Sequence, residues 1–184
     1  MKLKVIKNND LKKFINNPKN RFIKDQFEEN IYSIDFIDKA TKGYDTKTKK
    51  IFYAVYWIDP INRKLVSTCN IIYIPKYDKD RIFMNSKKKM FEIRDLFILP
   101  EFRGKGYCSQ FVNDLSNHIK KHNICKILKL DVLSTNEKAI KCYKRSNFKI
   151  HKDQNAEEYI DKNFINIYGF DPKCKPYIMI KNIK

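Results

Sequence analysis

The chain has 184 residues, 42% of them hydrophobic and 14% aromatic, a composition typical of one globular domain that we expect to span residues 1–184. No run of about 18 apolar residues is present, so the sequence predicts neither a transmembrane helix nor a membrane partner. The first ten residues, MKLKVIKNND, lack the apolar core of a secretory signal, and we therefore expect a cytoplasmic protein.

The net charge of +18 would fit a nucleic-acid partner, but the kind and distribution of the basic residues argue against one. Lysine outnumbers arginine by 33 to 6, although arginine is the better ligand for phosphate groups. The lysines are spread along the whole chain, and Lys, Asn and Ile, all abundant here, share A/T-rich codons. We interpret the charge mainly as codon bias, with an acidic macromolecular partner as the alternative.

The first half of the chain contains one strand signal, a helical region and a hairpin. Residues 2–7 alternate between polar and apolar types, which predicts a strand. Residues 9–39 carry apolar positions at helical spacing on both sides of Pro18, which predicts one or two helices broken near the proline. The apolar runs 51–58 and 65–74 flank an Asp-Pro turn signal and predict two paired strands.

The second half continues as strand, helix, strand, helix and two final strands, predicted at 90–99, 103–122, 125–133, 134–146, 148–151 and 176–183. Ser134 and Glu137 have the spacing of a capping box at the start of the second helix. The order of these elements, with strands first and then alternating strands and helices, predicts an α/β fold. We expect a mixed, mostly antiparallel central sheet with helices on both faces.

The turn Arg103-Gly104-Lys105-Gly106 joins a predicted strand directly to a predicted helix. Glycines allow backbone N–H groups to point at one place without a Cβ in the way. The helix N-terminus adds the positive end of its dipole, so the segment suits a pyrophosphate. Many tight turns also contain Gly-x-Gly, and an ordinary turn is the alternative interpretation of this segment alone.

A second segment, Asn136 to Phe148, follows the predicted strand at 125–133 by a few residues. Together the two segments resemble the GNAT superfamily of N-acetyltransferases. The turn resembles the family's Arg/Gln-x-x-Gly-x-Gly/Ala pyrophosphate loop, with matches at Arg103, Gly106 and Cys108. The helix resembles its Asn-x-x-Ala-x-x-x-Tyr motif, with matches at Asn136, Ala139 and Tyr143.

The two motifs lie about 30 residues apart, which is the family's usual spacing, and the close match covers residues 90–150. Two positions depart from the family pattern. Cys108 stands where Gly or Ala is usual, and Asn147 replaces the usual Gly before Phe148. Cysteine is small, and asparagine is among the non-glycine residues that best tolerate a positive φ, so neither change removes a functional side chain.

The resemblance implies that acetyl-CoA is the cosubstrate and that it lies where the strand at 90–99 splays from the strand at 125–133. It assigns the coenzyme pyrophosphate to the N–H groups of the turn and of the following helix, and the pantetheine arm to a strand edge and to Asn136. The residues implied in coenzyme binding are Leu96, Phe97, Ile98, Arg103, Gly104, Lys105, Gly106, Tyr107, Cys108, Ser109, Asn136 and Tyr143. For Asn136, a plain helix start is the alternative.

The resemblance also implies that Tyr143 donates a proton to the leaving thiolate. A thiol pKa of about 8.5 against about 10 for tyrosine makes that transfer nearly balanced in energy. The alternative is an aromatic residue that packs on the buried helix face.

Two carboxylates are candidates for the base that takes the proton of the attacking amine. Glu92 resembles a glutamate of the histone-acetylating branch, and Asp131 resembles a glutamate of amino-terminal acetyltransferases of ribosomal proteins. We favour Glu92 slightly because of its longer reach, provided that no bulge separates it from Ile98. Either carboxylate could instead be a solvated or ion-paired strand residue, with Arg94 as a partner for Glu92.

No metal site is predicted. His118 and His122 lie four residues apart on the predicted helix, but the sequence offers no third ligand, so we expect solvated histidines at the helix C-terminus.

The leading hypothesis is an acetyl-CoA-dependent N-acetyltransferase that acts on a primary amine of a protein, a peptide or a small molecule. The alternatives are a non-catalytic acyl-CoA-binding module of the same fold and, less favoured, a basic nucleic-acid-binding protein. Neither the acceptor nor the oligomeric state follows from the sequence. The aromatic-containing stretch 152–175 is a candidate cover for the acceptor side.

Overall fold

The computed structural model describes residues 1–30, 52–74, 86–151 and 176–184. Within these ranges the strands form one mixed sheet of seven, in the order β1-β2-β3-β4-β5-β7-β6. The strands are β1 (Lys2–Lys7), β2 (Phe52–Asp59), β3 (Lys64–Ile74), β4 (Met90–Ile98), β5 (Ile127–Leu133), β6 (Lys149–Ile150) and β7 (Pro176–Asn182).

The described helices are α1 (Asn8–Ile15), α2 (Arg21–Asn30), α5 (Tyr107–Lys121) and α6 (Glu137–Arg145), with short 3-10 turns η1 (Pro18–Asn20) and η2 (Pro100–Phe102). Each strand and helix expected from the pattern is present within the described ranges, and the α/β fold class is confirmed. Pro18 ends the first helical segment as predicted, because it begins η1 and the Asn17 side chain caps that turn. The stretch 152–175 lies outside the described residues. No helix in the described part of the chain is long and apolar enough to cross a membrane.

The chain divides into two compact units. Unit 1 comprises Met1–Tyr73 with Arg94–Phe111, and unit 2 comprises Ile74–Ile93 with Val112–Lys184. Strand β4 and helix α5 each contribute residues to both units. That the chain works as a single domain stays a prediction.

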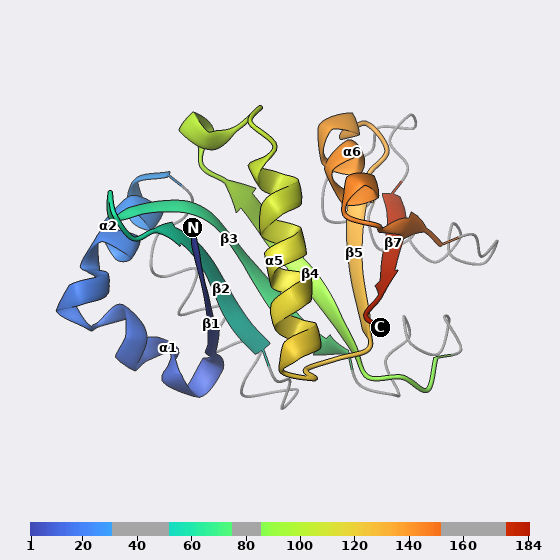
Figure 1. The fold of residues 1–184 in the computed structure, drawn as a ribbon, viewed down its shortest axis with the longest axis horizontal. Helices are drawn as coiled ribbons and strands as arrows, with labels where there is room; N and C mark the ends of the chain where they lie inside the picture. The colour runs from blue at the N-terminus through green and yellow to red at the C-terminus, as the bar shows by residue number, and fades with distance from the viewer. Residues whose placement is uncertain (31–51, 75–85, 152–175) are drawn as a thin grey trace. The chain divides into compact units, whose positions relative to one another are not determined.

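Unit 1 is built on the antiparallel strands β1, β2 and β3, with α1 and α2 alongside them (Figure 1). Because side chains alternate along a strand, β2 presents two apolar faces. Tyr56 packs in a cluster with Leu11 of α1 and Ile23 of α2, whereas Trp57 on the other face contacts Phe111 at the start of α5, with ring centroids 5.9 Å apart. Helices therefore cover both faces of this part of the sheet, as predicted.

Unit 2 is centred on β5, which is antiparallel to β7 along its whole length, from Ile127↔Asn182 to Leu133↔Pro176 (Figure 1). On its other side β5 is parallel to β4, but the register covers three residue pairs and ends at Glu92↔Lys129. Beyond that pair β4 passes into unit 1, and Asp95 has a φ of +52°, in the left-handed region. At Asp95 the backbone of β4 therefore departs from the extended conformation, between Glu92 and Ile98.

The start of α6 differs from the capping box predicted at Ser134 and Glu137. Asn136 is the N-cap, and its side-chain oxygen accepts a hydrogen bond from the Ala139 N–H at 3.2 Å. Asn and Ser are about equally good N-caps, so a sequence with both allows two starts two residues apart. At the far end of α6, Asn147 has a φ of +64°, which confirms that it holds the conformation for which the family pattern uses glycine.

Candidate functional site

The turn between β4 and α5 has the backbone expected of an anion cradle. Gly104 and Gly106 adopt φ angles of +76° and +79°, where side chains with a Cβ are strained. A Cβ built on either glycine would meet no atom within 4 Å, so the space above the turn is open. Helix α5 begins directly after Gly106. In any α-helix, the N–H groups of the first turn point out of the N-terminus and have no acceptor in the helix itself. These N–H groups and the helix dipole make the turn suited to a phosphate group.

The two cations of the turn fold back onto the backbone beside it. The Arg103 Nε donates a hydrogen bond to the Ile98 carbonyl at 2.9 Å, and its guanidinium lies over the Phe97 ring, 4.9 Å from the centroid. The Lys105 Nζ donates to the Glu101 carbonyl at 2.9 Å. Both side chains are exposed, so their positive charge also reaches solvent at the mouth of the turn.

Aromatic contacts hold this turn on the sheet of unit 1. The Tyr107 ring lies edge-on to Phe102 of η2 and to Trp57 of β2, with centroid distances of 5.8 and 5.7 Å. Trp57 is 1% exposed. Edge-to-face pairs of this kind are each worth about 0.5–1.5 kcal/mol beyond the area they bury. The first residue of α5 is thus anchored on both sides, which fixes the direction of its N-terminus.

Successive residues at the end of β4 direct their backbone N–H and C=O groups to opposite edges of the strand. The Phe97 carbonyl accepts a hydrogen bond from the Ser67 hydroxyl of β3 at 2.9 Å, and the Leu99 N–H donates to Val66 of β3 at 3.0 Å. Successive residues of an extended strand point to opposite edges, so the N–H and C=O groups of Leu96 and Ile98 face away from β3. Those two residues, and not Phe97, have the backbone orientation that an added strand would need.

In unit 2, Asn136 and Tyr143 occupy the two ends of one short helix. The Asn136 side-chain oxygen caps α6, which is the structural role weighed against coenzyme binding. Its amide nitrogen has no hydrogen-bond partner within the described residues, so capping leaves a donor for a further role. Tyr143 is 8% exposed, and its ring lies 6.1 Å from that of Phe148.

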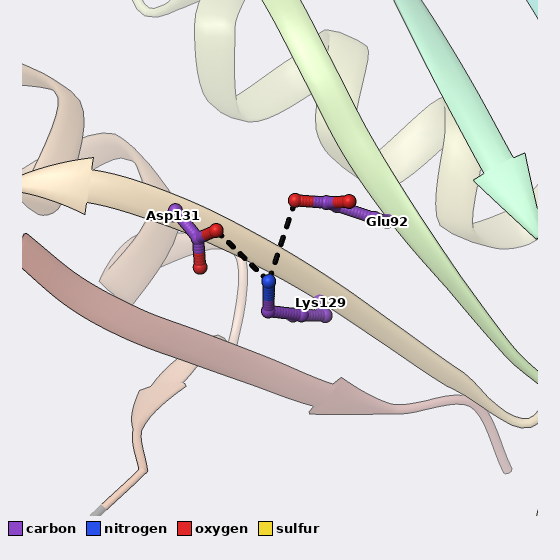
Figure 2. A network of polar contacts seen from close by, with 3 residues as sticks. All are labelled: Glu92, Lys129 and Asp131. Carbon is purple, nitrogen blue, oxygen red and sulfur yellow. Dashed lines mark hydrogen bonds and ion pairs between the residues drawn. The ribbon is translucent and has the colours of Figure 1, made fainter. Parts of the chain in front are cut away.

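The two candidate bases converge on one lysine that the sequence interpretation did not single out. Lys129 of β5 lies opposite Glu92 of β4, and its Nζ is 3.3 Å from the Glu92 Oε1. The same Nζ is 2.8 Å from the Oδ2 of Asp131, two residues along β5 and on the same face. Figure 2 shows the ammonium between the two carboxylates, one from each strand. The interpretation of Glu92 as an ion-paired strand residue is met here by Lys129, a partner that the sequence did not suggest.

The three side chains differ sharply in their access to solvent. Those of Lys129 and Glu92 are 2% and 8% exposed, whereas that of Asp131 is 38% exposed. The signal that could have revealed Lys129 is its position in the run CKILKLDVL, where Leu128 and Leu130 flank a charged residue inside a strand. Charged residues are almost never fully buried unless they are paired, so a lysine inside such a strand calls for a carboxylate nearby.

No group of three or more His, Cys, Asp or Glu side chains among the described residues is arranged to hold a metal ion. His118 and His122 lie at the end of α5 with ring centroids 4.3 Å apart. Burial and the charges of His122 and Lys121 lower the pKa of His118, which favours its neutral form at pH 7.

Comparisons with known proteins agree with the fold. The model of the acetyltransferase (GNAT) family matches residues 24–148, a segment that includes β4, the turn, α5, β5 and α6. No curated protein sequence matches the chain.

Solved structures of low sequence identity share the fold over nearly the whole chain. Spermidine N-acetyltransferase from Vibrio cholerae, in complex with CoA and spermine, has 16% identity and a TM-score of 0.56, covering 99% of this chain and 95% of that one. The N-acetyltransferase PseH of Campylobacter jejuni has 16% identity and a TM-score of 0.53, covering 99% of both chains. NAA60 of Arabidopsis thaliana, in complex with acetyl-CoA, has 14% identity and a TM-score of 0.57, also covering 99% of both.

The family model covers more than half of the chain, and its range contains both motifs on which the resemblance was based. This protein therefore belongs to the GNAT family of acetyltransferases.

Proposed function

We propose that this protein is an acetyl-CoA-dependent N-acetyltransferase that transfers an acetyl group to a primary amine. The observation that carries the proposal is the turn before α5, where two glycines at positive φ open onto free space at a helix N-terminus. In a chain of this family, that geometry fits the pyrophosphate of coenzyme A.

The coenzyme would bind through backbone groups more than through side-chain charges. The N–H groups from Gly104 to Ser109 would hold the pyrophosphate, with Arg103 and Lys105 adding positive charge. The pantetheine arm would pair with Leu96 and Ile98, whose backbone groups face away from β3. The Ile98 carbonyl has a second lone pair, so it can accept from pantetheine while Arg103 donates to the first. The Asn136 amide nitrogen would donate to a pantetheine carbonyl while its oxygen caps α6.

Catalysis needs one proton acceptor and one proton donor. A lysine-like amine has a pKa of about 10.4 and is almost fully protonated at pH 7, so a base must take its proton before it attacks. We assign that role to Asp131 in preference to Glu92. Asp131 is more than a third exposed, whereas Glu92 is buried and is separated from Ile98 by Asp95, whose positive φ interrupts the regular alternation of β4. Tyr143 would give its phenolic proton to the CoA thiolate as the thiolate leaves.

Acetyl-CoA should stabilise the folded protein, because a ligand that binds only the native state shifts the unfolding equilibrium. At a hundredfold excess over Kd the gain is about 2.7 kcal/mol. A thermal-shift titration with acetyl-CoA measures it, with pantetheine as a control that lacks the pyrophosphate. No shift at millimolar acetyl-CoA would contradict the coenzyme assignment.

The substitution Gly106→Glu should abolish that shift, because a carboxylate would enter the open space assigned to the pyrophosphate and repel it. The control is Gly106→Gln, which has the same size and the same backbone strain at a φ of +79° but no charge. Calorimetry should give a weaker affinity for the Glu variant than for the Gln variant. Unchanged affinity in a folded Gly106→Glu protein would place the coenzyme elsewhere.

Tyr143→Phe should lower kcat by about 10²–10⁴-fold, the usual cost of losing a general acid, with a smaller effect on KM for acetyl-CoA. The phenylalanine ring keeps the packing against Phe148, so the fold should survive. Steady-state kinetics with both substrates varied measure the effects on kcat and on KM separately. A variant with wild-type kcat would exclude Tyr143 as the proton donor. A wild-type protein that binds acetyl-CoA but acetylates no amine would support the non-catalytic module instead.

Asp131→Asn should lose activity most strongly near neutral pH and recover partly as the pH rises and more free amine forms in solution. Glu92→Gln is the matched comparison, since it also replaces one carboxylate of the same cluster with an amide, and it should lose less. Rate profiles from about pH 6.5 to 10 with one acceptor separate the two. The assignment fails if Glu92→Gln shows the larger loss at neutral pH, or if both variants keep the wild-type profile.

A further inference from the structure

Lys129 occupies a position where the strand pattern calls for an apolar residue. Its neighbours Leu128 and Leu130 are buried, and the lysine itself is 2% exposed. It also forms half of the last residue pair between β4 and β5, opposite Glu92. Burying an ammonium costs desolvation energy that the ion pairs must offset, and well-packed apolar residues often serve a sheet equally well. Strand pairing alone is therefore a weak reason for a lysine at this position.

Lys129 also balances the negative charges of Glu92 and Asp131. One ammonium stands between two carboxylates, and the oxygens that it contacts each lie within 3.3 Å of the same nitrogen. Without that cation, two neighbouring carboxylates would repel each other, and burial would further disfavour the charged form of Glu92. The pair would then hold a shared proton. With the cation in place, both carboxylates can be ionised and the cluster keeps one net negative charge.

Lys129 is the cation seen between these two carboxylates. Within the cluster, the charged groups beside Asp131 are Lys129 on its own strand and Glu92 on β4. On β7 the register partners of Asp131 and Lys129 are Ile178 and Ile180, which do not titrate. The charge of Lys129, whose Nζ lies 2.8 Å from the carboxylate, therefore favours the ionised form of Asp131.

We infer that Lys129 is a positioning residue of the transfer reaction, which keeps Asp131 ionised and fixes the direction of its carboxylate toward the acceptor amine. The inference rests on the proposed function. The acceptor ammonium gives one proton to Asp131, and the neutral nitrogen then attacks the thioester carbon. A C–N bond forms and the C–S bond breaks, and Tyr143 protonates the leaving thiolate. The second proton lost by the nitrogen restores Tyr143 through solvent, and Asp131 releases its proton to solvent.

The test compares Lys129→Met, an unbranched side chain one atom shorter and without the charge, with Lys129→Arg, which keeps the charge. Lys141→Met is the control for the loss of one cation, because Lys141 is 70% exposed and pairs with Glu137 on α6. For each variant, kcat and both KM values are measured from about pH 6.5 to 10, together with the thermal shift produced by acetyl-CoA.

Lys129→Met should lower kcat by about tenfold or more at pH 7, which is less than the 10²–10⁴-fold typical of losing the base itself. The pH at which kcat rises on the acidic side should move to a higher value. Without the lysine, Asp131 and Glu92 share a proton, and that proton must leave before Asp131 can act as the base. KM for acetyl-CoA and the acetyl-CoA thermal shift should stay unchanged. Lys129→Arg should restore the profile, and Lys141→Met should match the wild type. A folded Lys129→Met protein with the wild-type pH profile would overturn the inference, even if it were less stable.

A second measurement separates this inference from the proposed function. Carbon-13 NMR of the side-chain carboxyls follows the protonation of Glu92 and Asp131 without any turnover. In Lys129→Met the titration of the pair should move to higher pH, and in Lys129→Arg it should not. Unchanged carboxyl titrations in Lys129→Met overturn the inference whether or not the enzyme is active. A wild-type protein that acetylates no amine contradicts the proposed function, whatever the titrations give.

Discussion

A buried ammonium requires negative charge beside it, and in this protein that requirement links β4 to β5. Lys129 is nearly inaccessible to solvent and has one carboxylate from each strand within 3.3 Å. Removing one partner of a buried ion pair typically costs about 3–5 kcal/mol, because the charge left behind stays desolvated. The charges of this cluster therefore depend on one another, so a change to Glu92, Lys129 or Asp131 affects the other two. The cluster lies at the residue pair where the backbone register of the two strands ends.

The proposed coenzyme site depends on backbone geometry. The direction of the N–H groups in the turn is fixed by three features. These are two glycines at positive φ, a helix that begins immediately after them and the aromatic contacts of Tyr107. Arg103 adds a link to the end of β4 through the Ile98 carbonyl. The proposed division of labour follows from this contrast. Rigid backbone groups would hold the coenzyme, and a charge-balanced cluster of side chains would handle the acceptor proton.

Most of the fold could be predicted, because the strands and helices of this chain carry clear periodicity. The turn and the Asn136–Tyr143 helix could be found because their residues are close in sequence and their spacing is characteristic of the family. The positive φ of Asn147 also followed from its residue type and position.

The features that sequence analysis missed have physical reasons. Glu92 and Lys129 are 37 residues apart in the sequence, and only the parallel pairing of β4 and β5 brings them together. Asp95 adopts a positive φ without being a glycine, so nothing in the pattern MFEIRDLFIL marks this departure from the extended backbone. The preference for Glu92 as the base assumed a regular strand between Glu92 and Ile98, and it stays a prediction. Sequence rules most often fail where a site imposes strain or buried charge, and β4 and β5 carry both.

The central claim is that the protein moves an acetyl group from CoA to an amine. The most direct measurement follows the release of CoA thiol from acetyl-CoA in the presence of free amines, polyamines and peptides with free N-termini. Mass spectrometry of each acceptor accompanies it. The account predicts thiol release that depends on one class of amine, with one acetyl group gained by that acceptor for each thiol released. Thiol release that does not depend on any amine, or none at all from a protein that is folded and binds acetyl-CoA, would contradict it.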